Sequence, residues 1–230
     1  MDTAEWHRRR RNKYRHVAET YTPGVNPTRG LNRAVGYGAL RRGEGYISVA
    51  QGRYLYRLLR KNPRIRTVMQ VGFNAGHSAC WMLAARPSIT VVSFDLGRRD
   101  YVKLGHDYLE ETYPGRHTLV VGDSADGLPI YREQFPDQLA DLFFLDGGHE
   151  GDIVQTDFDN ARAMSATGWV VMDDMVGWQD WGAEPVRVWR KAVAEGTLTQ
   201  LALVQDGRVV PEIRRKPYHT TAMAVGRWVH

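Results

Sequence analysis

The chain has 230 residues, 43% of them hydrophobic, which is enough for one domain with a substantial core. No apolar run approaches the roughly 20 residues of a membrane helix, and no secretory signal follows the charged N-terminus, so we expect no membrane association. The single cysteine, Cys80, excludes an internal disulfide framework and fits a reducing, cytoplasmic setting.

The N-terminal segment carries much of the net charge of +5, in a basic run with aromatic residues between Trp6 and Arg15. Such a run can bind the phosphates of a nucleic acid, but it also fits a solvated arm or a contact with a neighbouring subunit. Residues 22–46 contain two prolines and six glycines without a steady period, which indicates one or two long loops. We therefore interpret residues 1–46 as a basic arm and a lid or oligomer-contact segment, and residues 47–230 as the domain proper.

The first half of this domain reads as helix, strand, glycine turn and helix. Apolar spacing predicts a helix from Ile47 to Lys61, and Thr67–Gly72 predicts the first strand. The turn Phe73–Ser78 opens a second helix, and its glycines allow a ligand to approach the backbone closely. The next strand, Ile89 to Phe94, ends in Asp95, at the distance where an acid accepts hydrogen bonds from a ribose.

A helix from about Arg98 to Tyr113 and a strand His117–Val121 follow. This strand ends in Gly122, Asp123 and Ser124, at the same edge of a parallel sheet. Asp123 or Ser124 could meet an adenine there, although turn formation and helix capping explain both residues equally well.

Residues 141–174 predict strand, helix and strand, with acidic residues at both strand ends. The run Leu142–Leu145 is followed by Asp146-Gly-Gly-His149, and Trp169–Met172 is followed by Asp173 and Asp174. Between them Asp152 can cap a helix, and Gly168 is expected to close the turn into the second strand. Because the carboxyl ends of parallel strands share one edge, the three aspartates should converge.

Three converging carboxylates repel one another unless a cation lies among them. Oxygen ligands without a nearby cysteine suit Mg²⁺ or another hard divalent ion, and His149 is placed to act as a base beside it. The alternative is that these aspartates cap the following helices and that His149 is structural.

The last part of the chain adds a tryptophan-rich loop and further elements. Trp178 and Trp181 could form the floor of an aromatic or sugar-binding pocket, or only close the edge of the core. A helix from Glu184 to Ala194 and strands near 199–205 and 221–228 complete the prediction.

The order of these motifs resembles that of class I S-adenosylmethionine-dependent methyltransferases. Within this class, residues 47–228 are similar to the metal-dependent O-methyltransferases of the catechol, caffeoyl-coenzyme A and macrocin types. The resemblance implies a three-layer α/β/α sandwich, with a Rossmann-like, mostly parallel seven-stranded sheet in the order 3-2-1-4-5-7-6 and its last strand antiparallel.

The resemblance also implies roles for individual residues. Asp146, Asp173 and Asp174 correspond to the metal ligands, and His149 to the catalytic base. The cofactor-binding positions are Gln70, Gly72, Asn74, Gly76, Ser78, Asp95, Asp123, Ser124 and Asp146. Two departures are Gln70 in place of the usual acid and an Asp-Asp pair in place of Asp-Asn or Glu-Asp.

The predicted function is metal-assisted methyl transfer from S-adenosylmethionine to a hydroxyl, one of a vicinal pair, of a small molecule such as a natural-product sugar or an aromatic. We expect the enzyme to form a homo-oligomer. One alternative is a metal-independent methyltransferase acting on nucleic acid, and another is a non-catalytic binding protein with the same fold. A nicotinamide dehydrogenase is disfavoured because the usual glycine triplet is absent.

Overall fold

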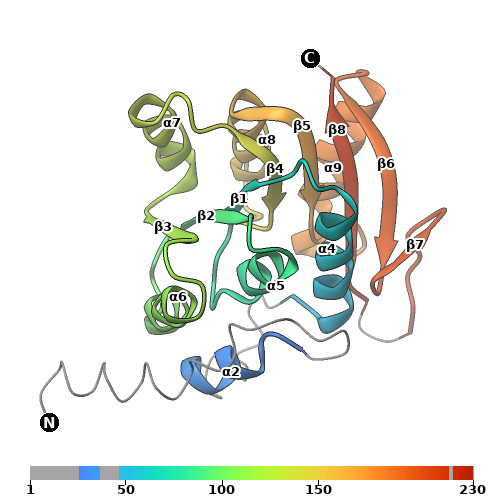
Figure 1. The fold of residues 1–230 in the computed structure, drawn as a ribbon. Helices are drawn as coiled ribbons and strands as arrows, with labels where there is room; N and C mark the ends of the chain where they lie inside the picture. Colours follow the sequence, from blue (N-terminus) through green and yellow to red (C-terminus); the bar gives the residue numbers. More distant parts are fainter. Residues whose placement is uncertain (1–25, 37–46, 218–219, 230) are drawn as a thin grey trace, which may run out of the picture.

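The computed structural model describes residues 26–36, 47–217 and 220–229, so the basic run between Trp6 and Arg15 lies outside the described residues. Its centre is an eight-stranded sheet in the order β3-β2-β1-β4-β5-β8-β6-β7 (Figure 1). The strands are β1 (Thr67–Val71), β2 (Thr90–Asp95), β3 (His117–Val121), β4 (Ala140–Leu145), β5 (Ser165–Met172), β6 (Leu198–Gln205), β7 (Arg208–Val210) and β8 (Ala222–Trp228). The described helices are α2 (Arg29–Val35), α4 (Val49–Lys61), α5 (His77–Ala85), α6 (Asp100–Thr112), α7 (Ser124–Gln134), α8 (Ile153–Ala163) and α9 (Asp180–Ala194).

The helices cover both faces of the sheet, which gives the predicted three-layer α/β/α sandwich (Figure 1). Helices α2, α4, α5 and α6 bury one core, and α7, α8 and α9 bury the other. Neighbouring residues of one strand serve opposite cores: Phe144 of β4 packs on the first side and Phe143 on the second. Strands that are buried on both faces need continuous apolar runs, as the sequence of β4 shows.

Strands β1 to β5 are parallel, and β8 is antiparallel to both β5 and β6. The predicted strand order and the antiparallel last strand are confirmed, but the predicted count of seven is one short. The additional strand, β7, forms a hairpin with β6 across Asp206 and Gly207, which both have positive φ. An Asp-Gly pair favours this type of turn, but a strand of three residues is too short to leave a periodic pattern.

Three local predictions need correction. β5 begins at Ser165, so Gly168 (φ 80°) lies inside the strand, near an irregularity of its pairing with β4, and not in a turn before it. Helix α9 begins at Asp180 instead of Glu184, so Pro185 lies inside the helix, where it has no N–H to donate to the carbonyl of Trp181. Helix α2 lies within the segment predicted as loop, packs on α6, and buries Leu31 completely.

In the part of the chain that the structure describes, no helix is both long and apolar enough to cross a bilayer.

Candidate active site

The glycine turn between β1 and α5 has a backbone that few residues can adopt. Gly72, Asn74 and Gly76 all have positive φ, at 86°, 51° and 85°. A Cβ on Gly72 would lie 1.8 Å from the carbonyl oxygen of Asp146, so a larger residue would push the ends of β1 and β4 apart. Glycine is therefore required here for both its conformation and its lack of a side chain.

Asp95, at the end of β2, holds this turn in place. Its Oδ2 accepts hydrogen bonds from the backbone N–H groups of Phe73 (3.0 Å) and Asn74 (2.8 Å). Its Oδ1 accepts from the N–H of Gly97 at 2.8 Å. A carboxylate has about four lone-pair positions, so Asp95 can still accept a hydrogen bond from a ligand in the cavity that it lines.

A cavity of about 850 Å³ lies along the carboxyl ends of the strands, where open α/β sheets bind ligands. Its size falls within the usual range for small-molecule sites. It collects most of the predicted site residues: Gly72, Asn74, Asp95, Asp123, Ser124, Asp146, His149, Asp173 and Asp174.

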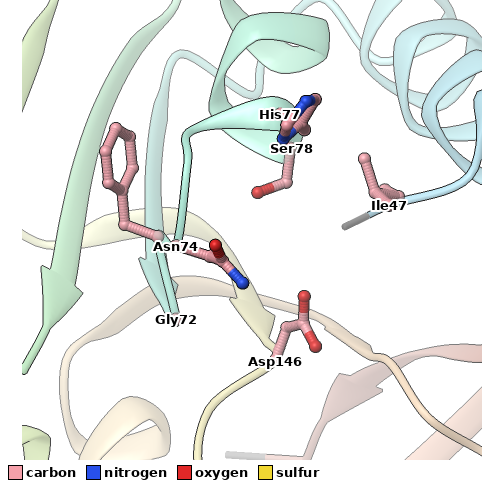
Figure 2. A pocket seen from close by; sticks show the side chains of 7 residues that line it. Ile47, Gly72, Asn74, His77, Ser78 and Asp146 are labelled. Atoms are coloured by element: carbon pink, nitrogen blue, oxygen red, sulfur yellow. The ribbon is translucent and has the colours of Figure 1, made fainter. Parts of the chain in front are cut away.

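A second hollow of about 40 Å³ shares Gly72, Asn74 and Asp146 with the main cavity. Figure 2 shows Asn74 from the turn, Ser78 from α5 and Asp146 from the end of β4 around this space. His77 lies beside them, and its Nε2 is 2.7 Å from Asn32 Oδ1 in α2. Burial lowers the pKa of His77 to about 4, so its ring is neutral near pH 7.

Two predicted cofactor residues do not line either cavity. Gln70 is fully buried, and its Oε1 accepts a hydrogen bond from the hydroxyl of Ser78 at 3.0 Å. Gln70 therefore acts on the pocket through Ser78 and not by direct contact. Gly76 caps the start of α5, where a Cβ would meet the ring of Phe73 at 2.7 Å.

Asp123 and Ser124 line the cavity, but each also has a structural role. The carboxylate of Asp123 caps α7 by accepting from the N–H of Ala125 at 3.0 Å. The hydroxyl of Ser124 lowers the pKa of the buried Asp157 of α8. Capping was therefore a correct interpretation of Asp123, and it is compatible with a ligand contact.

The acidic side of the cavity is organised around Asp173, which is 6% exposed. Its Oδ1 accepts from Gln51 Nε2 at 2.7 Å and from the N–H of Asp174 at 2.8 Å. Burial and the neighbouring Asp174 raise the pKa of Asp173 well above its usual range, although these two hydrogen bonds oppose the rise. Burial, Asp173 and Asp174 likewise raise the pKa of Asp146.

His149 and Asp174 are in contact on the same side of the cavity, with His149 Nε2 at 3.1 Å from Asp174 Oδ2. Asp174 has a φ of 54°, an uncommon value for a residue other than glycine. The start of α9 packs closely against this backbone, because a Cβ on Gly182 would lie 2.8 Å from the carbonyl oxygen of Asp174.

The donor set of the three aspartates fits a hard divalent cation. Three mutually repelling carboxylates, two of them with raised pKa values, would be relieved by a bound positive charge. Their oxygens do not all lie within 4.8 Å of one another, and Asp173 and Asp174 each use one oxygen for Gln51 or His149. Among the described residues, the group whose ligand atoms all lie within 4.8 Å of one another is instead His106, Glu110 and His117.

Sequence reasoning missed the contribution of α4. Ser48 and Gln51 form a capping box at its start, a pattern that the sequence shows as Ser-x-x-Gln. The contact of Gln51 with Asp173 joins residues 122 apart, and no local pattern indicates it. Trp181 lines the cavity and is 45% exposed, whereas Trp178 packs against the core.

A mostly parallel sheet with this glycine turn, an acid after β2 and three aspartates at the same edge is the arrangement of a class I methyltransferase fold. Residues 69–175 match the family described as "Methyltransferase domain". The predicted methyltransferase class agrees with this match, and the predicted fold is confirmed by the sheet topology.

The chain is similar to several solved structures. The O-methyltransferase TomG from Streptomyces achromogenes, involved in tomaymycin synthesis and crystallised with SAM, is 17% identical over 100% of both chains, with a TM-score of 0.71. The O-methyltransferase from Bacillus cereus in complex with SAH is 16% identical over 93% of this chain and 96% of its own, with a TM-score of 0.66. Cofactor-bound Rv0187 from MTB is 20% identical over 92% and 94%, with a TM-score of 0.67. A search of curated proteins gave no significant match.

Proposed function

We propose that this protein transfers the methyl group of S-adenosylmethionine to a hydroxyl group of a small molecule, with assistance from a divalent cation. One observation carries this proposal: a single cavity of about 850 Å³ is bordered by the glycine turn with Asp95 and also by the three aspartates with His149. A donor on the turn and an acceptor at the three aspartates would therefore share one cavity. Holding two reactants in this way removes much of the entropic barrier to their reaction.

The turn side supplies the groups that a nucleoside-containing cofactor needs. Asp95 offers its remaining carboxylate lone pair for a ribose hydroxyl, and Asp123 and Ser124 also border the cavity. Gly72 lines the cavity at the end of β1.

At the acidic rim, Asp146, Asp173 and Asp174 would hold Mg²⁺ or another hard divalent cation. Such an ion lowers the pKa of a bound hydroxyl and orients it. Gln51 keeps Asp173 in position by donating to Oδ1, which leaves Oδ2 for this purpose.

His149 is the candidate general base. When its Nε2–H donates to Asp174, its Nδ1 carries the lone pair that accepts the proton of the acceptor hydroxyl. The charge of Asp174 then stabilises the resulting imidazolium, as the carboxylate does in other His–Asp pairs. Asp174 would thus orient the base and also contribute to the cation site.

The exposed face of Trp181 at the cavity supports an aromatic or sugar-containing acceptor, because a flat indole packs well against either. Adjacent hydroxyls on that acceptor would suit a cation that binds two oxygens. The acceptor class is therefore a catechol-like ring or a vicinal diol.

The test is a methyl-transfer assay with labelled S-adenosylmethionine and a panel of catechols, vicinal diols and single alcohols. We expect transfer to a member of the first two groups, loss of transfer on chelation, and a loss of about 100-fold or more in His149→Ala, as for a general base. Asp152→Asn, an exposed change near His149, serves as the matched control and should retain activity. Chelator-insensitive methylation of a nucleic acid, with binding that falls steeply with salt, would instead establish the alternative.

A further inference from the structure

A second cluster of metal-ligating side chains lies away from the cavity, between α6 and β3. It consists of His106 and Glu110 on α6 and His117 at the start of β3, with ligand atoms all within 4.8 Å of one another. His106 and Glu110 are four residues apart and so share one helix face. Neither the methyl-transfer site nor the sequence motifs involve these three residues.

The two histidines face each other through their Nδ1 atoms, which are 2.9 Å apart. On its other side, His117 Nε2 is 2.8 Å from the hydroxyl of Ser93, which is completely buried. Ligating histidines typically use one ring nitrogen for the metal and give the other a hydrogen-bond partner that fixes the ring. Ser93 can serve as that partner by accepting from the Nε2–H of His117, and in this tautomer the Nδ1 lone pair of His117 is directed at the cluster.

Glu110 adds an anionic ligand whose carboxylate oxygens are poorly satisfied by hydrogen bonds. Its Oε1 is buried without a hydrogen-bond partner, and its Oε2 has only a long contact of 3.4 Å with the N–H of Gly115. A buried carboxylate oxygen without a partner is unfavourable unless a positive charge is near. A cation between Glu110 and the histidines would supply that charge.

We propose that His106, Glu110 and His117 form a binding site for a divalent transition-metal ion, with Zn²⁺ as the best-suited probe. Two imidazole nitrogens and one carboxylate oxygen match the donors that Zn²⁺ prefers, whereas Mg²⁺ prefers oxygen alone. Two nitrogens on a tetrahedral Zn²⁺ are roughly 3.3 Å apart, given Zn–N distances of about 2.0–2.1 Å. The rings therefore need to separate by only a few tenths of an ångström, and a water completes the coordination at the partly exposed side.

A metal at this site would also affect the glycine turn between β1 and α5, because the ring of His117 packs against that turn. The ring of His117 stacks on Phe73 with centroids 4.8 Å apart and an interplanar angle of 23°. The N–H of Phe73 in turn donates to Asp95. A metal that joins α6 to β3 would thus restrain the ring on which the glycine turn rests.

The experiment is a titration of the metal-free full-length chain with Zn²⁺, followed by calorimetry and thermal unfolding, and repeated with Co²⁺ for its visible absorption. We compare wild type with Glu110→Gln, which keeps the size of the side chain, and with His106→Ala. Asp107→Asn is the matched control, because Asp107 lies on the same helix and pairs with Lys103 instead. An Asp173→Asn variant shows whether Zn²⁺ binds instead at the three aspartates of the cavity.

We expect wild type, Asp107→Asn and Asp173→Asn to bind one Zn²⁺ at this site, with a rise in Tm on the order of 5 °C when Zn²⁺ is a hundredfold above Kd. Glu110→Gln and His106→Ala should bind at least about 100-fold more weakly, since even the loss of a residue that supports a ligand weakens binding 10- to 100-fold. Unchanged Zn²⁺ affinity in Glu110→Gln would overturn the proposal. So would binding lost only in Asp173→Asn, or the absence of binding in a folded wild type, which would show that the trio is a hydrogen-bonded histidine pair.

Discussion

Asp157 offers a quantitative test of the electrostatics beneath the cavity. It lies on α8, is 4% exposed, and has one oxygen without a hydrogen-bond partner. Burial, and to a lesser degree the charge of Asp123, raise its pKa from 3.8 to about 6, although the hydrogen bond from Ser124 lowers it. The folded state therefore favours the neutral carboxyl.

The direction of the pH effect follows from linkage. Because the pKa is higher in the folded state, the native protein holds this proton between pH 4 and pH 6 while the unfolded chain releases it. The contribution of Asp157 to the free energy of unfolding thus falls as the pH rises through this window and stays low above it. A pKa change from 3.8 to about 6, at about 1.4 kcal/mol for each tenfold change, corresponds to about 3 kcal/mol.

Asp157→Asn removes the ionisable group while keeping its size. We expect the free energy of unfolding above pH 7 to rise by up to about 3 kcal/mol, less if the introduced amide lacks an acceptor. The difference between variant and wild type should shrink towards zero between pH 6 and pH 4. Asp159→Asn, an exposed change on the same helix, should stay within about 0.5 kcal/mol of wild type at every pH.

Urea unfolding at half-unit pH intervals measures these differences directly. A destabilised Asp157→Asn at pH 8, or a difference that does not vary between pH 4 and pH 6, would refute this view of Asp157. Either result would mean that its ionised carboxylate is stabilised by groups on α8 or at the end of β4.

Four further predictions concern the site. Gly72→Ala should lower the free energy of unfolding by more than the roughly 1 to 3 kcal/mol that a strained φ costs, because its Cβ also clashes with Asp146. The control is Gly196→Ala, where φ is 70° and the space around the Cβ is open. Equal losses of stability in the two variants by urea unfolding would show that the clash contributes nothing. Wild type should lose about 2 kcal/mol of stability between pH 7 and pH 5, because burial lowers the pKa of His77 to about 4 and the native state therefore resists protonation. His77→Gln should abolish this loss. A variant that loses as much stability as wild type would contradict this reasoning. Gln51→Ala should lower the free energy of unfolding by about 2 to 4 kcal/mol, because it removes a helix cap and the buried hydrogen bond to the carboxylate of Asp173. Ser48→Ala removes only the cap and should lower it by about 1 kcal/mol. Similar losses in the two variants would mean that the contact with Asp173 contributes nothing. Asp173→Asn should stabilise the metal-free protein by relieving repulsion and should abolish its thermal stabilisation by Mg²⁺; retained stabilisation would place Mg²⁺ elsewhere.

Much of the fold was predictable because its strands are short apolar runs with polar ends. The run before Asp146 and the run before Asp173 each gave a strand, and their parallel pairing follows from the helix between them. The convergence of Asp95, Asp146 and Asp173 on one cavity is a consequence of that topology.

The remainder depends on contacts that no local pattern encodes. Gln51 reaches Asp173 only because α4 packs beside α5 on one face of the sheet, which brings its first turn to the end of β5. Gln70 is fully buried and bonds Ser78 instead of lining the cavity. The trio around His117 likewise joins a helix and a strand through side chains that individually look structural. Sequence spacing fixes which edge a residue reaches, whereas packing decides which of its atoms remain available.

The most direct test of the central proposal, that the turn held by Asp95 binds the methyl donor, is a calorimetric titration with S-adenosylmethionine. Wild type should bind one equivalent, and Asp95→Asn should bind roughly 10- to 100-fold more weakly, as expected when hydrogen bonds to a charged acceptor are lost. Equal affinities in two folded proteins, or no binding to wild type, would contradict the proposed position of the donor.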